Sequence, residues 1–229
     1  MEITDWFIAP SREVYEKAQL DERFQYIVAL GRAVNALNFV RSLAQLRGLE
    51  EDSPAAKRDR MNSYLFGSAI MYEALLLIRR LNKPFAADPI FQNGLRLLLK
   101  DKDAQAIERE HLDAVRNQAV FHFIPATFAA AIQKHSKPEK FCSGQGTTIA
   151  GVNFSYSDII AAEILMGSYA DVDSDPDALQ KFNAVVARTN TLTGQFVELA
   201  ENLIRHTLGN LGFELFMDRS QQPGVSSSQ

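Results

Sequence analysis

The sequence predicts an all-α fold, a helical bundle with a small β-hairpin insertion near residues 137–156. Apolar residues recur every three or four positions over most of the chain, a spacing that places them on one face of a helix. Ser-Pro or Asp-Pro pairs at 53–54, 88–89 and 175–176 precede three of these stretches, and a small polar residue followed by proline is a typical helix start. Glycines and alternating apolar residues concentrate between 137 and 156, which favours a hairpin there.

Five helices are predicted before this insertion, over residues 11–20, 21–46, 54–81, 89–100 and 103–123. Ser11 is the expected N-cap of the first. The helix over 21–46 has about seven turns, and its apolar residues form one stripe. The residues expected on that stripe are Phe24, Ile27, Val28, Val34, Leu37, Val40 and Leu43.

Two helices are predicted after the insertion, one over 157–169 and a last long one that starts at 175–176. The chain contains no internal repeat and no Pro/Gly/Ser-rich linker before its end. Residues 1–219 are therefore expected to form a single helical-bundle domain. Residues 220–229, rich in serine and glutamine, are expected to be a disordered tail.

Composition favours a cytoplasmic globular protein. Apolar residues make up 46% of the 229, and Cys142 is the one cysteine, so the chain cannot form an intrachain disulfide. The N-terminus opens with acidic residues rather than a basic, apolar leader. Uninterrupted apolar runs fall far short of the roughly 20 residues that span a bilayer. We therefore expect no association with a membrane.

Charge is distributed unevenly along the chain. The net charge of −4 argues mildly against nucleic-acid binding, yet residues 32–83 hold nine Lys/Arg against five Asp/Glu, and residues 158–218 hold three against ten. Such an asymmetry can concentrate an anionic ligand on one side of a protein. The simpler interpretation is that both regions are solvated helix faces.

No metal site or cofactor is predicted. Glu108-x-x-His111 has the spacing of di-iron bundles, but that architecture needs a second such pair, and the sequence has none. A surface helix explains the pair better. Asp171, Asp173 and Asp175 lack the glycine and the final glutamate of a calcium loop, and they are better explained as charges at a helix start.

The segment from Arg116 to His122 is the most suggestive of chemistry. Arginine offers a planar fork of donors suited to phosphate, and histidine can move a proton near neutral pH. Asn117 adds a polar neighbour that can orient either group. In an α-helix, six residues leave Arg116 and His122 about 120° apart, so two copies facing across a two-fold axis would make a more complete site than one copy.

The stretch Val115–His122 resembles the Arg-x4–6-His motif of the HEPN superfamily, in which a polar residue usually follows the arginine. This resemblance covers about ten residues, and beyond them only the all-α architecture is similar. It implies catalytic roles for Arg116, Asn117 and His122 in a homodimer that cleaves RNA without a metal. It also implies a protein of toxin or defence type, with a cognate antitoxin protein as a partner.

Two other functions remain open at this stage. Part of the superfamily lacks nuclease activity, so the chain could be a non-catalytic helical dimer that binds a nucleotide or a protein partner. Phenylalanines such as Phe121, Phe123 and Phe128 also suggest a bundle that holds an apolar small molecule, although core packing explains them more simply.

Overall fold

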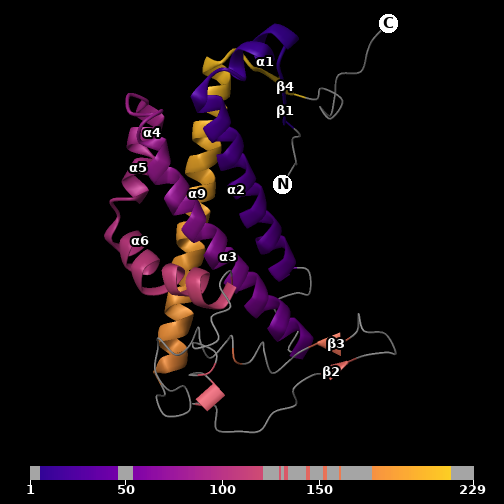
Figure 1. Ribbon diagram of the computed structural model, residues 1–229, viewed down its shortest axis with the longest axis vertical. Helices are drawn as coiled ribbons and strands as arrows, with labels where there is room; N and C mark the ends of the chain where they lie inside the picture. Colours follow the sequence, from indigo (N-terminus) through magenta and orange to yellow (C-terminus); the bar gives the residue numbers. More distant parts are fainter. Residues whose placement is uncertain are drawn as a thin grey trace, which may run out of the picture.

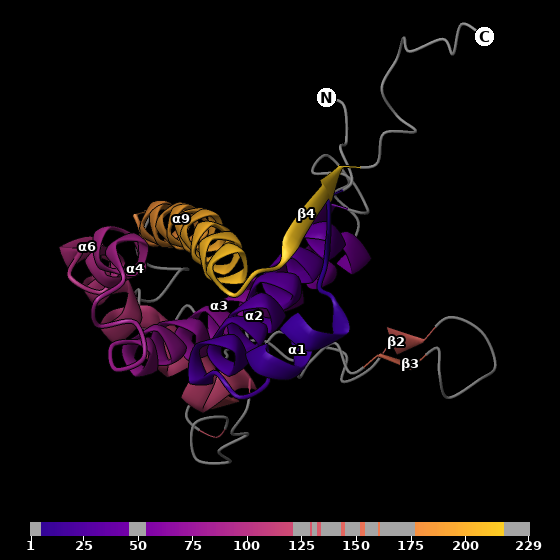
Figure 2. The same ribbon diagram turned by 90° about the horizontal axis from the view of Figure 1, so that it is seen from above.

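Three long helices form the framework of the protein, as the all-α prediction requires: α2 (Glu22–Gln45), α3 (Pro54–Leu81) and α9 (Ala178–Asn210). They pack along one another in the computed structural model, with shorter helices along one side (Figures 1 and 2). Most of the described chain is helical. The residues that the structure describes are 6–45, 54–120, 129, 132–133, 143–144, 152–153, 160 and 177–217.

The first predicted helices are confirmed closely. Helix α1 (Arg12–Ala18) begins at the expected N-cap, where the Ser11 hydroxyl accepts a hydrogen bond from the backbone N–H of Val14. Helix α2 buries Ile27, Val34 and Leu37 as predicted, together with Leu30. Val28 was expected on the same stripe, but 58% of it is exposed. It lies about 100° around the helix from Ile27, which takes it off the buried face.

Helix α3 lies at the centre of the hydrophobic core. It begins at Pro54, ends at Leu81 as predicted, and contacts α2, α9 and the segment that follows α6. Its residues Met71, Leu75 and Ile78 are fully buried. A smaller apolar cluster joins Leu65 and Ala69 of α3 to the chain near residue 115, so α3 buries side chains on more than one face.

The single helix predicted over 89–100 is wrong, because the chain breaks there into α4 (Pro89–Asn93) and α5 (Leu95–Leu98). The predicted start is confirmed, since the Asp88 carboxylate caps α4 by accepting from Phe91 N–H at 3.0 Å. The break falls at Gly94, where an added Cβ would lie 2.8 Å from the Ile90 carbonyl oxygen. Glycine permits this close approach of backbone to backbone.

The helix predicted over 103–123 begins one residue early and is not α-helical throughout. Asp101 caps α6 (Lys102–Ile107) by accepting from Ala104 N–H. The chain then continues through two π-helical segments, η1 (Glu108–Leu112) and η2 (Val115–Val120). Residues 121–123 lie outside the described part of the chain.

Two short strands near the ends of the chain were not predicted. Strand β1 (Trp6–Ala9) pairs antiparallel with β4 (Glu214–Met217), which follows α9 through a turn at Gly212 with φ +85°. A positive φ is the conformation that glycine adopts without strain. Figure 1 shows this pair beside α1 at one end of the bundle.

The predicted hairpin falls mostly outside the described residues. Within 137–156 the structure describes β2 (Ser143–Gly144) and β3 (Val152–Asn153), which pair antiparallel. Two residues on each side are too few to establish the insertion, which stays a prediction. The predicted tail at 220–229 also lies outside the described part.

One described stretch, Asp59–Leu81 of α3, has the length and apolar composition of a membrane span. Its most apolar window has a mean hydropathy of 1.3, and 44% of that window is buried inside the molecule. The core helix of a soluble protein meets the same criteria. Uninterrupted apolar runs did not reveal this stretch, because charged residues such as Glu73 interrupt them.

Replacing the two glycines Gly94 and Gly194 by alanine should give opposite changes in stability. Gly94→Ala should lower the free energy of unfolding by about 1–3 kcal/mol, because its Cβ collides with backbone. Gly194→Ala should raise it by up to about 1 kcal/mol, since α9 is helical there and the described chain has no atom within 4 Å of the new Cβ. Urea unfolding followed by circular dichroism measures both, and equal effects of the two substitutions would contradict this account of the break.

Candidate functional site

Of the residues that resemble the HEPN motif, Val115–Val120 form the π-helical segment η2, which contacts α3. Val115 is buried against Leu65 and Ala69 of α3 and anchors the start of η2. Arg116 and Asn117 follow it and are each half-buried. A π-helical turn, with i→i+5 hydrogen bonds, is rare and occurs frequently at functional sites.

A carboxylate that sequence analysis did not identify holds Arg116. The Nε of Arg116 donates to Glu73 Oε1 at 2.9 Å, and Nη2 lies 2.8 Å from the same oxygen. The side chains are 27% and 44% exposed, so the pair is accessible to water. The two residues are 43 positions apart, and no local pattern in the sequence connects them.

Asn117 extends this contact into a chain of hydrogen bonds. Its Oδ1 accepts from Nη1 of Arg116 at 2.6 Å, and its Nδ2 donates to Asp113 Oδ1 at 2.8 Å. Asp113 also hydrogen-bonds the Tyr72 hydroxyl, and this contact raises the pKa of Tyr72. These two hydrogen bonds hold the amide of Asn117 with its oxygen toward the guanidinium and its nitrogen toward Asp113.

An anion that binds to this network has to compete with carboxylates for Arg116. Glu73 and Asp113 place two carboxylates around the single guanidinium of Arg116. An incoming phosphate must therefore replace Glu73 on one edge of the guanidinium or bind along another. The network holds the fork in place, which reduces the entropy that it would lose on binding.

His122, the third predicted site residue, lies outside the described part of the chain. The 120° offset between Arg116 and His122 assumes an α-helix, and the structure differs from that assumption at Arg116. Arg116 lies in a π-helical turn, and such a turn contains more residues than an α-helical one. That angle therefore does not apply to this turn, and the case for a two-fold site depends on the resemblance.

The interpretation of Glu108-x-x-His111 as a surface pair is wrong for His111, which is 2% exposed. Its Nε2 lies 2.6 Å from the Tyr64 hydroxyl, and that hydroxyl lies 3.4 Å from Thr189 Oγ1 of α9. Burial lowers the pKa of His111 to about 4, so the ring is neutral at pH 7. Glu108 instead contacts Arg79 at 2.5 Å.

Within the part of the chain that the structure describes, no group of three or more His, Cys, Asp or Glu could hold a metal ion. Cys142 and the three aspartates at 171, 173 and 175 are among the residues that the structure does not describe. The candidate site therefore consists of Arg116 and Asn117 with the carboxylates that hold them.

Comparisons with protein-family models, with curated proteins and with solved structures find no match to this chain.

The buried histidine should make stability depend on pH. An unfolded chain takes up a proton on His111 near pH 6.5, whereas the folded chain does so only near pH 4. The free energy of unfolding should therefore fall as the pH falls through this window. The loss between pH 7.5 and 5.5 is about 1 kcal/mol by this linkage.

His111→Gln should lack this part of the pH dependence, because glutamine can hydrogen-bond Tyr64 without titrating. Urea titrations of both proteins at the two pH values measure the difference. The same pH dependence in both proteins would mean that His111 titrates normally in the folded state.

Proposed function

We propose that the protein is a metal-independent endoribonuclease of toxin or defence type whose active site is completed by a second copy of the chain. The observation that carries the proposal is the hydrogen-bonded pair Arg116–Asn117, fixed in a half-exposed π-helical turn. An oriented arginine with an oriented amide beside it is what a phosphodiester-cleaving site needs for charge stabilisation. The sequence resemblance supplies the remaining group, His122.

The proposed reaction is attack of an RNA 2′-hydroxyl on the adjacent phosphorus, with loss of the 5′-oxygen. One His122 removes the proton from the 2′-hydroxyl, or a protonated His122 donates one to the departing 5′-oxygen. Arg116 binds the non-bridging oxygens, and Asn117 keeps the guanidinium in place. The products are a 2′,3′-cyclic phosphate and a free 5′-hydroxyl, so DNA, which lacks the 2′-hydroxyl, is not cleaved.

The proposal includes a homodimer in the cytoplasm, with RNA as substrate and a cognate antitoxin protein as a partner. The single cysteine of the chain suits a reducing compartment. The alternative function is a non-catalytic helical dimer that binds a nucleotide or protein partner. The competition between Glu73 and phosphate for Arg116 weakens the binding of RNA and of a nucleotide alike, and the experiment below separates the two functions.

Purified protein should cleave single-stranded RNA in EDTA and leave 2′,3′-cyclic ends. His122→Ala should slow cleavage by about 10²–10⁴-fold, the usual effect of losing an acid–base group. Arg116→Ala should slow it by about 10²–10³-fold, and Asn117→Ala by less, because Asn117 orients rather than transfers protons. Gel analysis of end-labelled RNA measures all three.

Arg188→Ala is the matched control, because Arg188 is also a half-exposed arginine in an ion pair, with Asp103 at 3.3 Å. It should cleave RNA at the wild-type rate. Melting temperatures of Arg116→Ala and Arg188→Ala should change little, since an exposed ion pair contributes about 0–1 kcal/mol. Full activity of His122→Ala would rule out the mechanism. Nucleotide or RNA binding without cleavage would support the alternative function.

A composite site also requires two chains. Light scattering coupled to size exclusion should report roughly twice the chain mass of 25.6 kDa at micromolar concentration. Arg188→Ala should elute at the same volume as wild type. A monomer that still cleaves RNA would show that one chain holds a complete site.

A further inference from the structure

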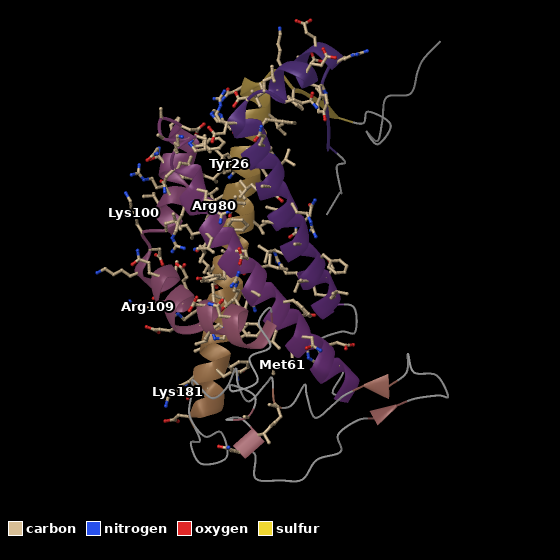
Figure 3. The ribbon with its side chains drawn as sticks, viewed as in Figure 1. Tyr26, Met61, Arg80, Lys100, Arg109 and Lys181 are labelled. Carbon is tan, nitrogen blue, oxygen red and sulfur yellow. The ribbon has the colours of Figure 1, made fainter. Side chains whose placement is uncertain are left out.

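A second polar site lies at the C-terminal end of α3, away from Arg116. It is a pocket of about 330 Å³ between the end of α3 and α5, lined by Asn82, Ala86, Arg96, Leu99 and Lys100. Figure 3 labels Lys100 on the side of the molecule formed by α4, α5 and α6. The lining contains two cations and no carboxylate.

The carboxylates of the chain segment that forms this pocket are engaged elsewhere. Residues 79–108 contain six Lys/Arg and four Asp/Glu. The acidic residues Asp88 and Asp101 cap helices, while Asp103 and Glu108 pair with arginines. Five cations of this stretch therefore have no carboxylate partner in the described part of the chain. They are Arg80, Lys83, Arg96, Lys100 and Lys102.

The structure fixes the position of one of the two lining cations. The Nη1 of Arg96 donates to Gln92 Oε1, and Nε2 of Gln92 donates to the Ala86 carbonyl at 2.8 Å. The guanidinium is thus tied through Gln92 to the turn that forms the other wall of the pocket. The guanidinium has five N–H donors, and Gln92 accepts from its Nη1 group.

Compensation of the helix dipole does not explain the two lining cations. Cations near a helix C-terminus are stabilised by the dipole, and this accounts for Arg79 and Arg80 in the last turn of α3. Arg96 and Lys100, in contrast, belong to or follow α5, which has only four residues. So short a helix has little dipole to compensate.

The separation between the pocket and the candidate cleavage site can be estimated from residue positions along α3. Asn82 is nine residues beyond Glu73, the partner of Arg116, and this corresponds to about 14 Å along a helix axis. Arg80 lies between them, seven residues from Glu73 and hence on nearly the same stripe of α3. Nine residues also turn Asn82 about half a circle around α3 from Glu73, so 14 Å is the axial part of the separation. A stacked strand rises about 3.4 Å per nucleotide and therefore needs at least about four nucleotides to span it.

We infer that this pocket binds a backbone phosphate of single-stranded RNA, at least about four nucleotides from the bond that is cleaved. The inference rests on the proposed function for its substrate. Arg96 and Lys100 hold the phosphate, and Arg80 lies along the path of the strand toward Arg116. Contacts of this kind position a strand without reading its sequence.

The test is the salt dependence of RNA binding by Arg96→Gln/Lys100→Gln. Anisotropy of a fluorescent single-stranded RNA 12-mer is measured between 50 and 300 mM NaCl, in a His122→Ala background that leaves the RNA intact. Losing the contact with this one phosphate should reduce the slope of log K against log salt by about 0.7, which weakens binding roughly fourfold near 0.15 M. With active protein, the double variant should raise KM for the 12-mer and leave cleavage of a dinucleotide unchanged.

Arg12→Gln/Lys17→Gln is the matched control, since it removes two exposed cations from α1 and should leave binding unchanged. An unaltered slope in the pocket variant would overturn the inference, while cleavage dependent on His122 would remain. Loss of binding without any cleavage by the wild type would support the pocket and reject the nuclease. Binding of AMP as tight as that of the 12-mer, and equally sensitive to the pocket variant, would assign the pocket to a free nucleotide and overturn the inference.

Discussion

The burial of α3 on several sides is the constraint on which the rest of the structure depends. The helix packs against α2 on one side, against α9 on another and against the η1–η2 segment on a third. The helix is not fully covered, since 44% of its most apolar stretch is buried, and half-exposed charged residues of α3 form ion pairs with the elements packed against it. Glu73 binds Arg116, and Arg79 binds Glu108. The position of the candidate site is thus set by the packing of α3.

The same constraint shapes the electrostatics of the site. Arg116 leaves the buried face occupied by Val115 and meets a carboxylate from α3 immediately. A half-exposed ion pair of this kind contributes little to stability, so its value lies in the orientation that it gives to the guanidinium. The cost is competition, because any phosphate must attract the arginine more strongly than Glu73 does. A second phosphate contact remote from Arg116, such as the pocket at Arg96, reduces that cost by retaining the strand through an independent interaction.

Sequence periodicity predicted the long helices, but it did not predict the break at Gly94 or the pairing of the two terminal strands. The starts at Ser11, Pro54 and Asp88 were predictable because capping residues act on their own neighbours. The break at Gly94 was not, since it depends on how closely two backbone segments approach. The pairing of β1 with β4 joins residues more than 200 positions apart, and neither four-residue segment is long enough to show a period. Burial of His111 was missed because its partner Tyr64, whose hydroxyl also lies near Thr189, belongs to another helix.

The residues of the candidate site were also predictable only where they form a local sequence pattern. Arg116 and Asn117 were identified because the resemblance is a local pattern, and their mutual hydrogen bond joins neighbours in sequence. Glu73 and Tyr72 carry no such pattern, although Glu73 competes with any anion for the arginine and Tyr72 hydrogen-bonds Asp113. The chemistry of the motif therefore also depends on residues of α3 that lie outside the motif. A chain with the same Arg-Asn pair and a neutral residue in place of Glu73 would lack this competitor for the cation, and we expect it to bind phosphate more tightly but with a less fixed guanidinium. Affinity for the anion and orientation of the arginine are in this way opposed, and the described structure combines an oriented arginine with two carboxylates in the same network.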